Sequence, residues 1–276
     1  MSTYAYLGPS GTFTESALKD ITSAADQLLP CANVTAALNA VRNGSTDFAL
    51  VPIENSVEGV VARTLDELAT GEALEIVAET TIAVTFALMV LPQNVGKKIT
   101  RVATHPHAES QCRAYIAREL PDAEVIATPS TAAAAEGLKD GNWDAAIAAK
   151  IAAEKFGLTV IAENIGDNDV AVTRFVLIRR PSRSSTPTGF DRTSLVAYIG
   201  MDHAGALLEI LTEFAKHDVN LTFIQSRPTG RELGHYHFII DVEGHLDDAS
   251  VSQSIAGLRA ICEDIRVLGS YPRARK

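Results

Sequence analysis

A threonine and an arginine stand side by side in an otherwise apolar segment, Thr173-Arg174-Phe175. The polar loop Asn164–Asp169 precedes them, and we expect a strand from Val170 to Ile178. A hydroxyl can donate a proton and a guanidinium can hold a carboxylate, so both are candidates for chemistry. Side chains alternate along a strand, which places Thr173 and Phe175 on one face and Arg174 on the other. An edge or lobe-joining strand with one polar side is the alternative.

Polar residues near the ends of other predicted elements form a second group of candidates. Open α/β sheets bind ligands at the carboxyl ends of their strands, and the free amides at a helix start favour anions. Structural turns and helix caps are the alternative interpretation. The candidates are Gly11, Thr12, Asn55, Ser56, Thr104, Gln111, Ser130 and Thr131.

Strands and helices alternate along residues 1–180, which predicts an α/β fold with mostly parallel sheets. We expect lobe one to comprise residues 1–75 and 159–180, and lobe two residues 76–158, with a cleft between them. The β-branched segment Ile76–Leu91 looks too long for one sheet and could carry the chain from one lobe to the other.

The last part of the chain follows a different plan. Residues 181–191 are rich in Pro, Ser, Thr and Gly and predict a linker. Residues 192–276 predict the order βαββαβ of the α+β ferredoxin-like fold. Helices would cover one face of its sheet, so we expect the bare face to pair with a second copy in a homo-oligomer. His235 and His237 share a strand face and are interpreted as a solvated or interface pair rather than metal ligands.

Composition excludes several classes of function. The chain has 276 residues and a net charge of −10, which argues against nucleic acid as a partner. No apolar run is long enough to span a membrane, and no signal segment is recognised. Three cysteines without metal spacing indicate a cytoplasmic protein with reduced thiols. His105 and His107 lack a third ligand at helical spacing, so we expect no metal.

Several of these segments, in their order and spacing, resemble the prephenate dehydratase family over essentially the whole chain. The first matching segments are Gly8 to Phe13, Pro52 to Ser56, Thr104-His105-Pro106 and Gln111-Cys112, and Thr173-Arg174-Phe175 is the family's signature triplet. The C-terminal segment is similar to an ACT domain, on Gly205-Ala206-Leu207, Leu211 and Gln225-Ser226-Arg227-Pro228. The resemblance also implies the two-lobed fold of type-II periplasmic binding proteins.

The resemblance implies a reaction that converts prephenate to phenylpyruvate with loss of carbon dioxide and water, in L-phenylalanine biosynthesis. Thr173 would be the catalytic residue and no cofactor would be needed. Arg174 could clamp a carboxylate or form a structural ion pair, and Phe175 could wall the substrate ring or pack in the core.

L-Phenylalanine is the expected feedback effector, at a domain–domain interface. Gln225 stands where the family more often has Glu, which puts the strength of that feedback in question. The expected effector-binding residues are Gly205, Ala206, Leu207, Asn220, Leu221, Gln225, Ser226, Arg227 and Pro228.

Two rival functions stay open at this point. Arogenate dehydratases perform the same chemistry on an aminated substrate, and the sequence does not separate the two. A non-catalytic amino-acid or solute sensor is the rival from another class, because both folds also serve as ligand binders. The choice between a dimer and a tetramer is open as well.

Overall fold

The computed structural model describes residues 1–182, 185–200, 203–229 and 236–274. These residues form two compact units, each discontinuous in sequence. Unit 1 comprises Met1–Ala37, Leu50–Val60 and Thr81–Phe175, and unit 2 comprises Leu38–Ala49, Val61–Thr80 and Val176–Lys276. None of the helices in the described part of the chain is long and apolar enough to cross a membrane.

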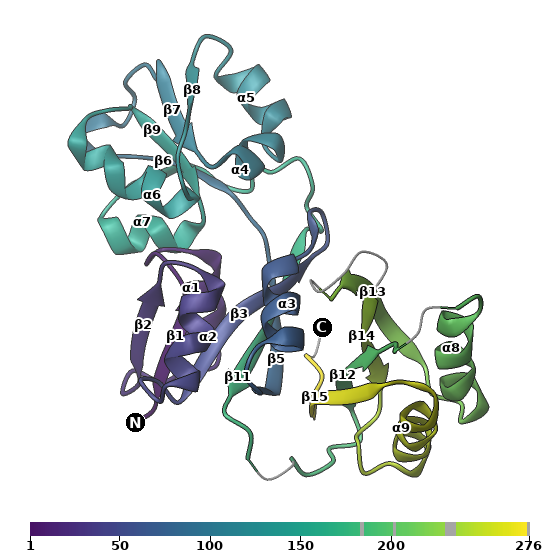
Figure 1. The fold of residues 1–276 in the computed structure, drawn as a ribbon. Coiled ribbons are helices and arrows are strands. Elements are labelled where there is room, and N and C mark those ends of the chain that lie inside the picture. Colours follow the sequence, from purple (N-terminus) through teal and green to yellow (C-terminus); the bar gives the residue numbers. More distant parts are fainter. Residues whose placement is uncertain (183–184, 201–202, 230–235, 275–276) are drawn as a thin grey trace. The chain divides into compact units, whose positions relative to one another are not determined.

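The first sheet has the strand order β2-β1-β3-β11-β5, and β4 pairs with β3 (Figure 1). Its central strand β3 carries the buried run Ala49, Leu50 and Val51, typical of a strand covered on both faces. The strands are β1 (Thr3–Leu7), β2 (Gln27–Cys31), β3 (Phe48–Asn55), β4 (Gly59–Val60), β5 (Glu75–Ala83) and β11 (Val172–Arg179). The helices that follow its strands are α1 (Phe13–Lys19), α2 (Val34–Arg42) and α3 (Ala62–Thr70).

The second sheet has the order β10-β6-β9-β7-β8 and helices against both faces. Alternate residues divide between two cores: Leu88 packs with α4 and α5, whereas Met89 packs with α6 and α7. The strands are β6 (Ala87–Val90), β7 (Arg101–Thr104), β8 (Glu124–Ala127), β9 (Ala145–Ala148) and β10 (Thr159–Ala162). The helices are α4 (Pro106–Ser110), α5 (Arg113–Glu119), α6 (Thr131–Glu136) and α7 (Lys150–Phe156), with 3₁₀ turns at Pro92–Asn94 and Gly137–Asp140.

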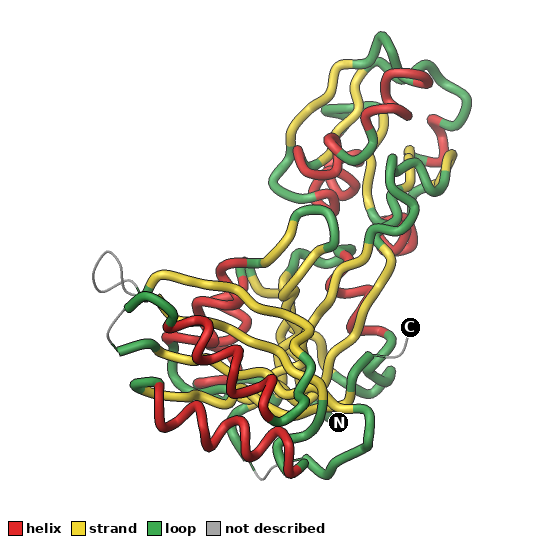
Figure 2. The backbone as a smooth tube through the Cα atoms, turned by 90° about the vertical axis from the view of Figure 1, so that its right-hand side faces the viewer, coloured by secondary structure: helices red, strands yellow, loops and turns green. Residues whose placement is uncertain are grey.

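The third sheet has the order β13-β14-β12-β15, and the chain passes through it as βαββαβ. Two helices lie side by side over one face, as Figure 2 shows. Leu195, Ile240 and Ile265 point into this helix-covered core. The elements are β12 (Asp191–Tyr198), α8 (Ala206–Lys216), β13 (Leu221–Pro228), β14 (Tyr236–Glu243), α9 (Ala249–Ile261) and β15 (Asp264–Pro272).

The predicted fold class is confirmed. The long segment 76–91 does divide between two sheets, as β5 in the first and β6 in the second. The chain returns to the first sheet between β10 and β11, so two crossings join the sheets in the two-lobed plan. The ferredoxin-like order of the C-terminal segment is also present.

Three expectations about the fold were wrong. The second sheet is mixed rather than mostly parallel, because β6 pairs antiparallel with both β9 and β10. The helix expected from Ala108 to Glu119 is interrupted between α4 and α5. The second face of the third sheet is not bare, since Arg192 pairs with Glu79 of β5 at 3.2 Å and Arg227 pairs with Asp66 of α3.

Candidate functional site

The end of β3 and the start of β11 bring Asn55 and Thr173 into direct contact within unit 1. Asn55 Nδ2 donates to Thr173 Oγ1 at 2.8 Å, across 118 residues of sequence. The Asn55 side chain is fixed at its other end, because its Oδ1 accepts from the amides of Val57 and Glu58 at 2.8 and 2.9 Å. Since Thr173 Oγ1 accepts from Asn55, the threonine proton points away from Asn55 and can be donated to a third group.

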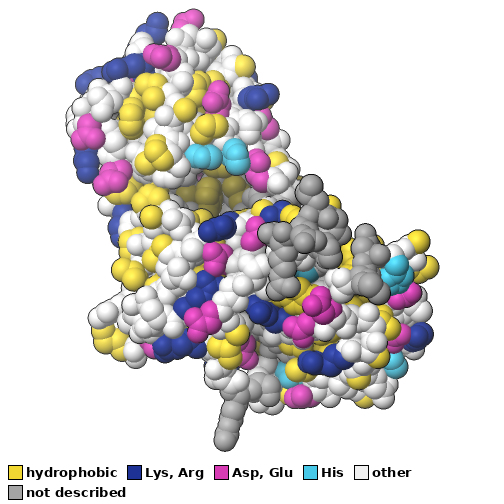
Figure 3. Space-filling model, in the orientation of Figure 1, with side chains coloured by type: hydrophobic (Ala, Val, Ile, Leu, Met, Phe, Trp, Pro, Cys, Tyr) yellow, Lys and Arg dark blue, Asp and Glu magenta, His cyan; other side chains and the backbone are white. Residues whose placement is uncertain are grey.

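Ser56 ties the same two strand ends together. Its amide donates to the Val172 carbonyl at 2.9 Å, and its hydroxyl accepts from the Val172 amide at 3.0 Å. The surface of unit 1 is hollowed between the part that carries β6 to β9 and the part that carries β1 to β3, with hydrophobic side chains in the hollow (Figure 3). Thr173 is 8% exposed, so its hydroxyl lies in a largely water-excluded setting.

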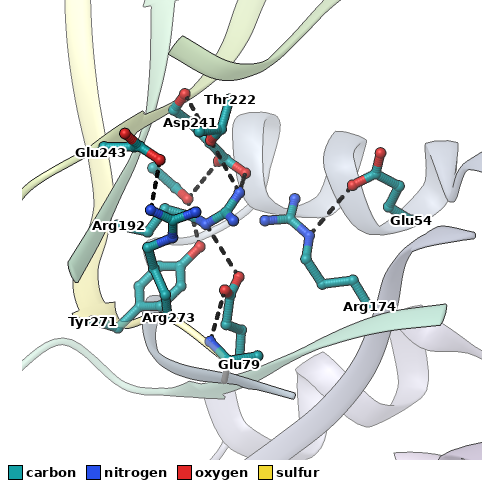
Figure 4. A network of polar contacts seen from close by, with 11 residues as sticks. Glu54, Glu79, Arg174, Arg192, Thr222, Asp241, Glu243, Tyr271 and Arg273 are labelled. Carbon is teal, nitrogen blue, oxygen red and sulfur yellow. Dashed lines mark hydrogen bonds and ion pairs between the residues drawn. The ribbon is translucent and has the colours of Figure 1, made fainter. Parts of the chain in front are cut away.

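Arg174 faces the opposite way from Thr173. Its Nε lies 3.4 Å from Glu54 Oε2, and Figure 4 shows the guanidinium directed at that carboxylate. Glu54 precedes Asn55 on β3, and Arg174 follows Thr173 on β11. The two pairs therefore alternate across the pleat, as the period of a strand requires. Phe175 is buried in the core, next to Val176.

The loop before α1 is organised around a buried carboxylate that the sequence did not single out. Gly11 has φ +86°, and its amide donates to Glu15 Oε2 at 2.5 Å. Thr12 caps α1 by accepting from the Glu15 amide and donates to the Leu7 carbonyl at 3.3 Å. Lys155 of α7 compensates the Glu15 charge at 3.2 Å. The Gly11 amide expected to meet a ligand is thus engaged by the protein.

The remaining candidates of unit 1 serve different structural tasks. Thr104 is fully buried, and its hydroxyl donates to the Ile147 carbonyl at 2.8 Å. Ser130 caps α6 by accepting from the Ala133 amide at 3.0 Å, and the half-buried Thr131 begins that helix. Gln111 Nε2 donates to Glu58 Oε1 at 3.1 Å. Their proposed contacts with a substrate stay predictions.

Glu58 is a further residue that sequence reasoning missed. It receives Gln111 on one oxygen, and its other oxygen lies 3.6 Å from His107 Nδ1. His105 caps α4 and stacks edge-on with His107. Burial lowers the pKa of His105, and the neighbouring His107 lowers it further. Glu58 follows Asn55 by three residues, so its proximity to that strand end was the available signal.

Of the effector residues expected near the start of α8, Ala206 borders a cavity of about 330 Å³ in unit 2. Gly205 has φ +96° and immediately precedes the helix, which suits the glycine at that position. The Ala206 amide donates to the His203 carbonyl at 3.1 Å, and Leu207 is exposed. Ala206 lines the cavity together with His203, Glu209, Ile210 and Cys262.

The other effector candidates lie on and before β13. The Asn220 carbonyl accepts from the Glu243 amide at 2.9 Å, and Leu221 packs against the core. Gln225 Nε2 donates to the Ser226 carbonyl at 3.0 Å, and Ser226 and Pro228 are exposed. Arg227 forms a bidentate pair with Asp66 of α3 at 2.8 and 2.7 Å, so its guanidinium is engaged within unit 2.

Comparison with known proteins agrees with this architecture. The family model "Prephenate dehydratase" matches residues 4–183, and the model "ACT domain" matches residues 194–260. The prephenate dehydratase of Amycolatopsis methanolica is 46% identical over 99% of this chain and 90% of its own length.

Two solved structures cover 99% of the chain. One is the prephenate dehydratase of Arthrobacter aurescens in complex with L-Phe, with 49% identity, a TM-score of 0.92 and 90% of its own chain covered. The other is GqqA, described as a quorum-quenching acylase, with 29% identity, a TM-score of 0.86 and 98% covered. The matched models and the 46% identical relative show that this chain belongs to the prephenate dehydratase family and ends in an ACT domain, so its reaction is the dehydration and decarboxylation of prephenate.

Proposed function

We propose that Thr173 donates its proton to the departing ring hydroxyl of prephenate, and that Asn55 positions it for this step. The observation that carries the proposal is the Asn55 Nδ2 to Thr173 Oγ1 hydrogen bond of 2.8 Å. This hydrogen bond directs a lone pair of the Thr173 hydroxyl toward Asn55, which leaves the O–H group free to point at the substrate. The Asn55 side chain is itself fixed by two backbone amides, so little reorganisation accompanies the reaction.

A threonine is a poor acid, because its pKa lies far above neutrality. Proton transfer to the leaving hydroxyl must therefore be late, after the C–O bond has largely broken. Loss of carbon dioxide sends its electron pair into the ring as the hydroxyl leaves, and the aromatic product supplies the driving force. The protein contributes alignment and a fixed hydrogen-bond donor rather than strong acidity.

The substrate is a dianion in a protein of net charge −10, so its site must be locally favourable to carboxylates. We infer that Ser56, Gln111, Ser130 and Thr131 supply polar contacts, together with the Thr12 amide, whereas the Gly11 amide is held by Glu15. Arg174 and Phe175 support the site rather than touch the substrate, since one pairs with Glu54 and the other is buried. Thr104 supports β7 through its buried hydroxyl.

For regulation, we propose that L-phenylalanine binds to the ACT domain at the start of α8 and on β13. The Arthrobacter aurescens structure is described as a complex with L-Phe, and the cavity beside Ala206 has a suitable size. An effector can change activity only by binding two conformational states with different affinity. Feedback inhibition therefore predicts an enzyme whose affinity for L-phenylalanine falls when substrate is bound.

Cellular location and assembly follow as further parts of the proposal. We infer a cytoplasmic homo-oligomer that joins through its ACT domains. All three cysteines are free, and burial raises the pKa of Cys112 to about 12 and of Cys262 to about 11, which suits a reducing compartment. β13 is an edge strand with an exposed Ile224, which suits a protein interface.

The deciding experiment compares kcat/KM for prephenate and arogenate in one preparation, with and without L-phenylalanine. We expect phenylpyruvate to form from prephenate, a lower kcat/KM for arogenate, and inhibition by L-phenylalanine. A preference for arogenate would reassign the substrate. Tight binding of prephenate without turnover would instead identify a sensor and remove Thr173 from any catalytic role.

A further inference from the structure

Four side chains form a row across the third sheet, on the face away from its helices. His237 of β14 lies opposite Arg227 of β13 on one side and opposite Tyr198 of β12 on the other. Tyr198 in turn lies opposite Asp264 of β15. Residues directly opposite one another in a sheet share a face. Their sequence neighbours, including Ala197 and Ile265, point into the helix-covered core, so the row points the other way.

Helix α3 is anchored on this face by polar contacts within unit 2. Arg227 holds Asp66 with two hydrogen bonds, and the Tyr198 hydroxyl donates to the Ala69 carbonyl. Arg266, which lies two residues beyond Asp264, donates from Nη1 to the carbonyls of Leu68 and Gly71 at 3.3 and 2.9 Å. The carbonyl groups of Leu68, Ala69 and Gly71, at and just beyond the C-terminal end of α3, are therefore satisfied by side chains of the sheet.

His237 is the buried member of the row that makes no hydrogen bond to α3 or to any other described residue. Its side chain is fully buried, and neither ring nitrogen has a hydrogen-bond partner among the residues described. The burial of His237 excludes the solvated one of the two placements expected from sequence, solvated or at an interface, and His235 lies outside the described residues. Native proteins pair nearly all buried polar groups, so a buried imidazole with both nitrogens open indicates an occupant that completes it.

The imidazole borders a cavity of about 380 Å³, within the range of small-molecule sites. The wall opposite the sheet is the end of α3, with Ala69 and Thr70. The remaining lining residues are Tyr198, Ile199, Thr229, Glu263, Asp264 and Arg266. This cavity is separate from the one beside Ala206, although Ile199 and Glu263 border both.

The charges around the cavity favour a cation. Glu263 and Asp264 are exposed carboxylates at the start of β15, whereas Arg266 is engaged by α3 and Asp66 by Arg227. Burial lowers the pKa of His237, with Asp66 raising it and Arg227 lowering it, so the ring is neutral near pH 7 and offers one acceptor nitrogen.

We propose that this cavity binds the primary ammonium group of a small ligand, which donates to His237 and pairs with Asp264 and Glu263. An amine and a free amino acid share this chemistry. In either case the ligand would bridge the sheet and the end of α3, and add a fourth contact to the three that already anchor the helix. The proposal does not depend on the role given to Thr173.

Calorimetric titration of the full chain with three probes tests the site. The probes are 2-phenylethylamine, which has only the ammonium, 3-phenylpropanoate, which has only the carboxylate, and L-phenylalanine, which has both. We expect the amine to bind and the carboxylate not to compete with it. Tighter binding of L-phenylalanine at this site would identify an amino acid as the ligand, and binding no tighter than the amine would identify an amine.

Variants locate the binding. Asp264→Asn should weaken the amine about threefold to tenfold, and His237→Leu about tenfold, because each removes one partner of the ammonium group. Asp218→Asn makes the same change of charge on an exposed residue outside the cavity and should have no effect. Asp264 is exposed, so its variant retains the fold even where His237→Leu does not.

A second readout follows His237 itself. The ring ¹⁵N resonances of His237 should shift on addition of the amine and stay unchanged with 3-phenylpropanoate. The proposal is overturned by an amine that does not bind, by equal affinities in Asp264→Asn and Asp218→Asn, or by ring resonances that do not respond.

Discussion

The first and third sheets use their polar side chains in opposite ways. At the ends of β3 and β11, neighbouring residues point apart: Asn55 meets Thr173 on one face, and Glu54 meets Arg174 on the other. On the third sheet, residues from four strands line up on a single face, as Arg227, His237, Tyr198 and Asp264 do. The contrast shows that consecutive residues of one strand point to opposite faces, whereas residues paired across neighbouring strands share a face even when they are distant in sequence.

The largest expected effect tests the Thr173 face. Thr173→Val removes the hydroxyl with little change of volume, and kcat should fall by about 10²- to 10⁴-fold. Steady-state assay with prephenate measures it, and circular dichroism checks that the variant remains folded. Thr173→Ser is the matched control, because it keeps the hydroxyl and should retain much more activity. A near-normal kcat for Thr173→Val would remove the residue from the mechanism.

Asn55→Asp comes next in size. The variant keeps the oxygen that accepts from Val57 and Glu58 but loses the amide that donates to Thr173. We expect kcat to fall about 10- to 100-fold. In the double variant with Thr173→Val, the loss of transition-state stabilisation should be smaller than the sum of the two single losses, because both residues act through one hydroxyl. Asn33→Asp is an exposed control whose Oδ1 also accepts from a backbone amide, that of Ala36, and it should be neutral. Fully additive losses would show that Asn55 acts independently of Thr173.

Arg174→Gln probes the opposite face of the same strand. Arg174 is 7% exposed and pairs with Glu54, so its loss should lower the free energy of unfolding by about 1–3 kcal/mol. kcat/KM should change less than about tenfold, since the pleat directs Arg174 away from Thr173. Denaturant unfolding and kinetics measure the two quantities. Arg179→Gln on the same strand, which breaks the pair with Glu75, is the comparison. A kcat/KM loss of a hundredfold or more with unchanged stability would restore Arg174 as a carboxylate clamp.

The smallest effect concerns the third sheet. Asp66→Asn breaks the bidentate pair with Arg227. The Asp66 side chain is 35% exposed and the Arg227 side chain 25%, so the loss should lower the free energy of unfolding by about 1 kcal/mol. A double-mutant cycle with Arg227→Gln isolates the pair, and its coupling energy should be of that order. Coupling near zero would mean that the contact does not anchor α3. The other polar cluster of unit 2, in which Arg192 lies between Glu79 and Asp241 (Figure 4), should remain intact in these variants.

Local pattern was sufficient for much of the fold. The βαββαβ order, the buried strand β3 and the division of segment 76–91 between two sheets all follow from periodicity and length. The strand β2 was not predicted, because its local signals are weak. It contains Pro30 and lies at the edge of the sheet, and its residues are half-buried or exposed. Its sequence therefore shows neither a continuous apolar run nor a clean alternation.

For the site, the sequence by itself determined that Thr173 and Arg174 face apart, because the alternation of a strand is a local property of its backbone. It also placed Asn55 and Ser56 near the carboxyl end of a buried strand, where β3 ends at Asn55. Only the tertiary structure decided that Asn55 donates to Thr173, since strand order and register depend on packing between segments 118 residues apart. The same holds for Glu15 under the Gly11 loop and for His237, whose burial arises from α3 and three other strands rather than from any feature of β14 alone.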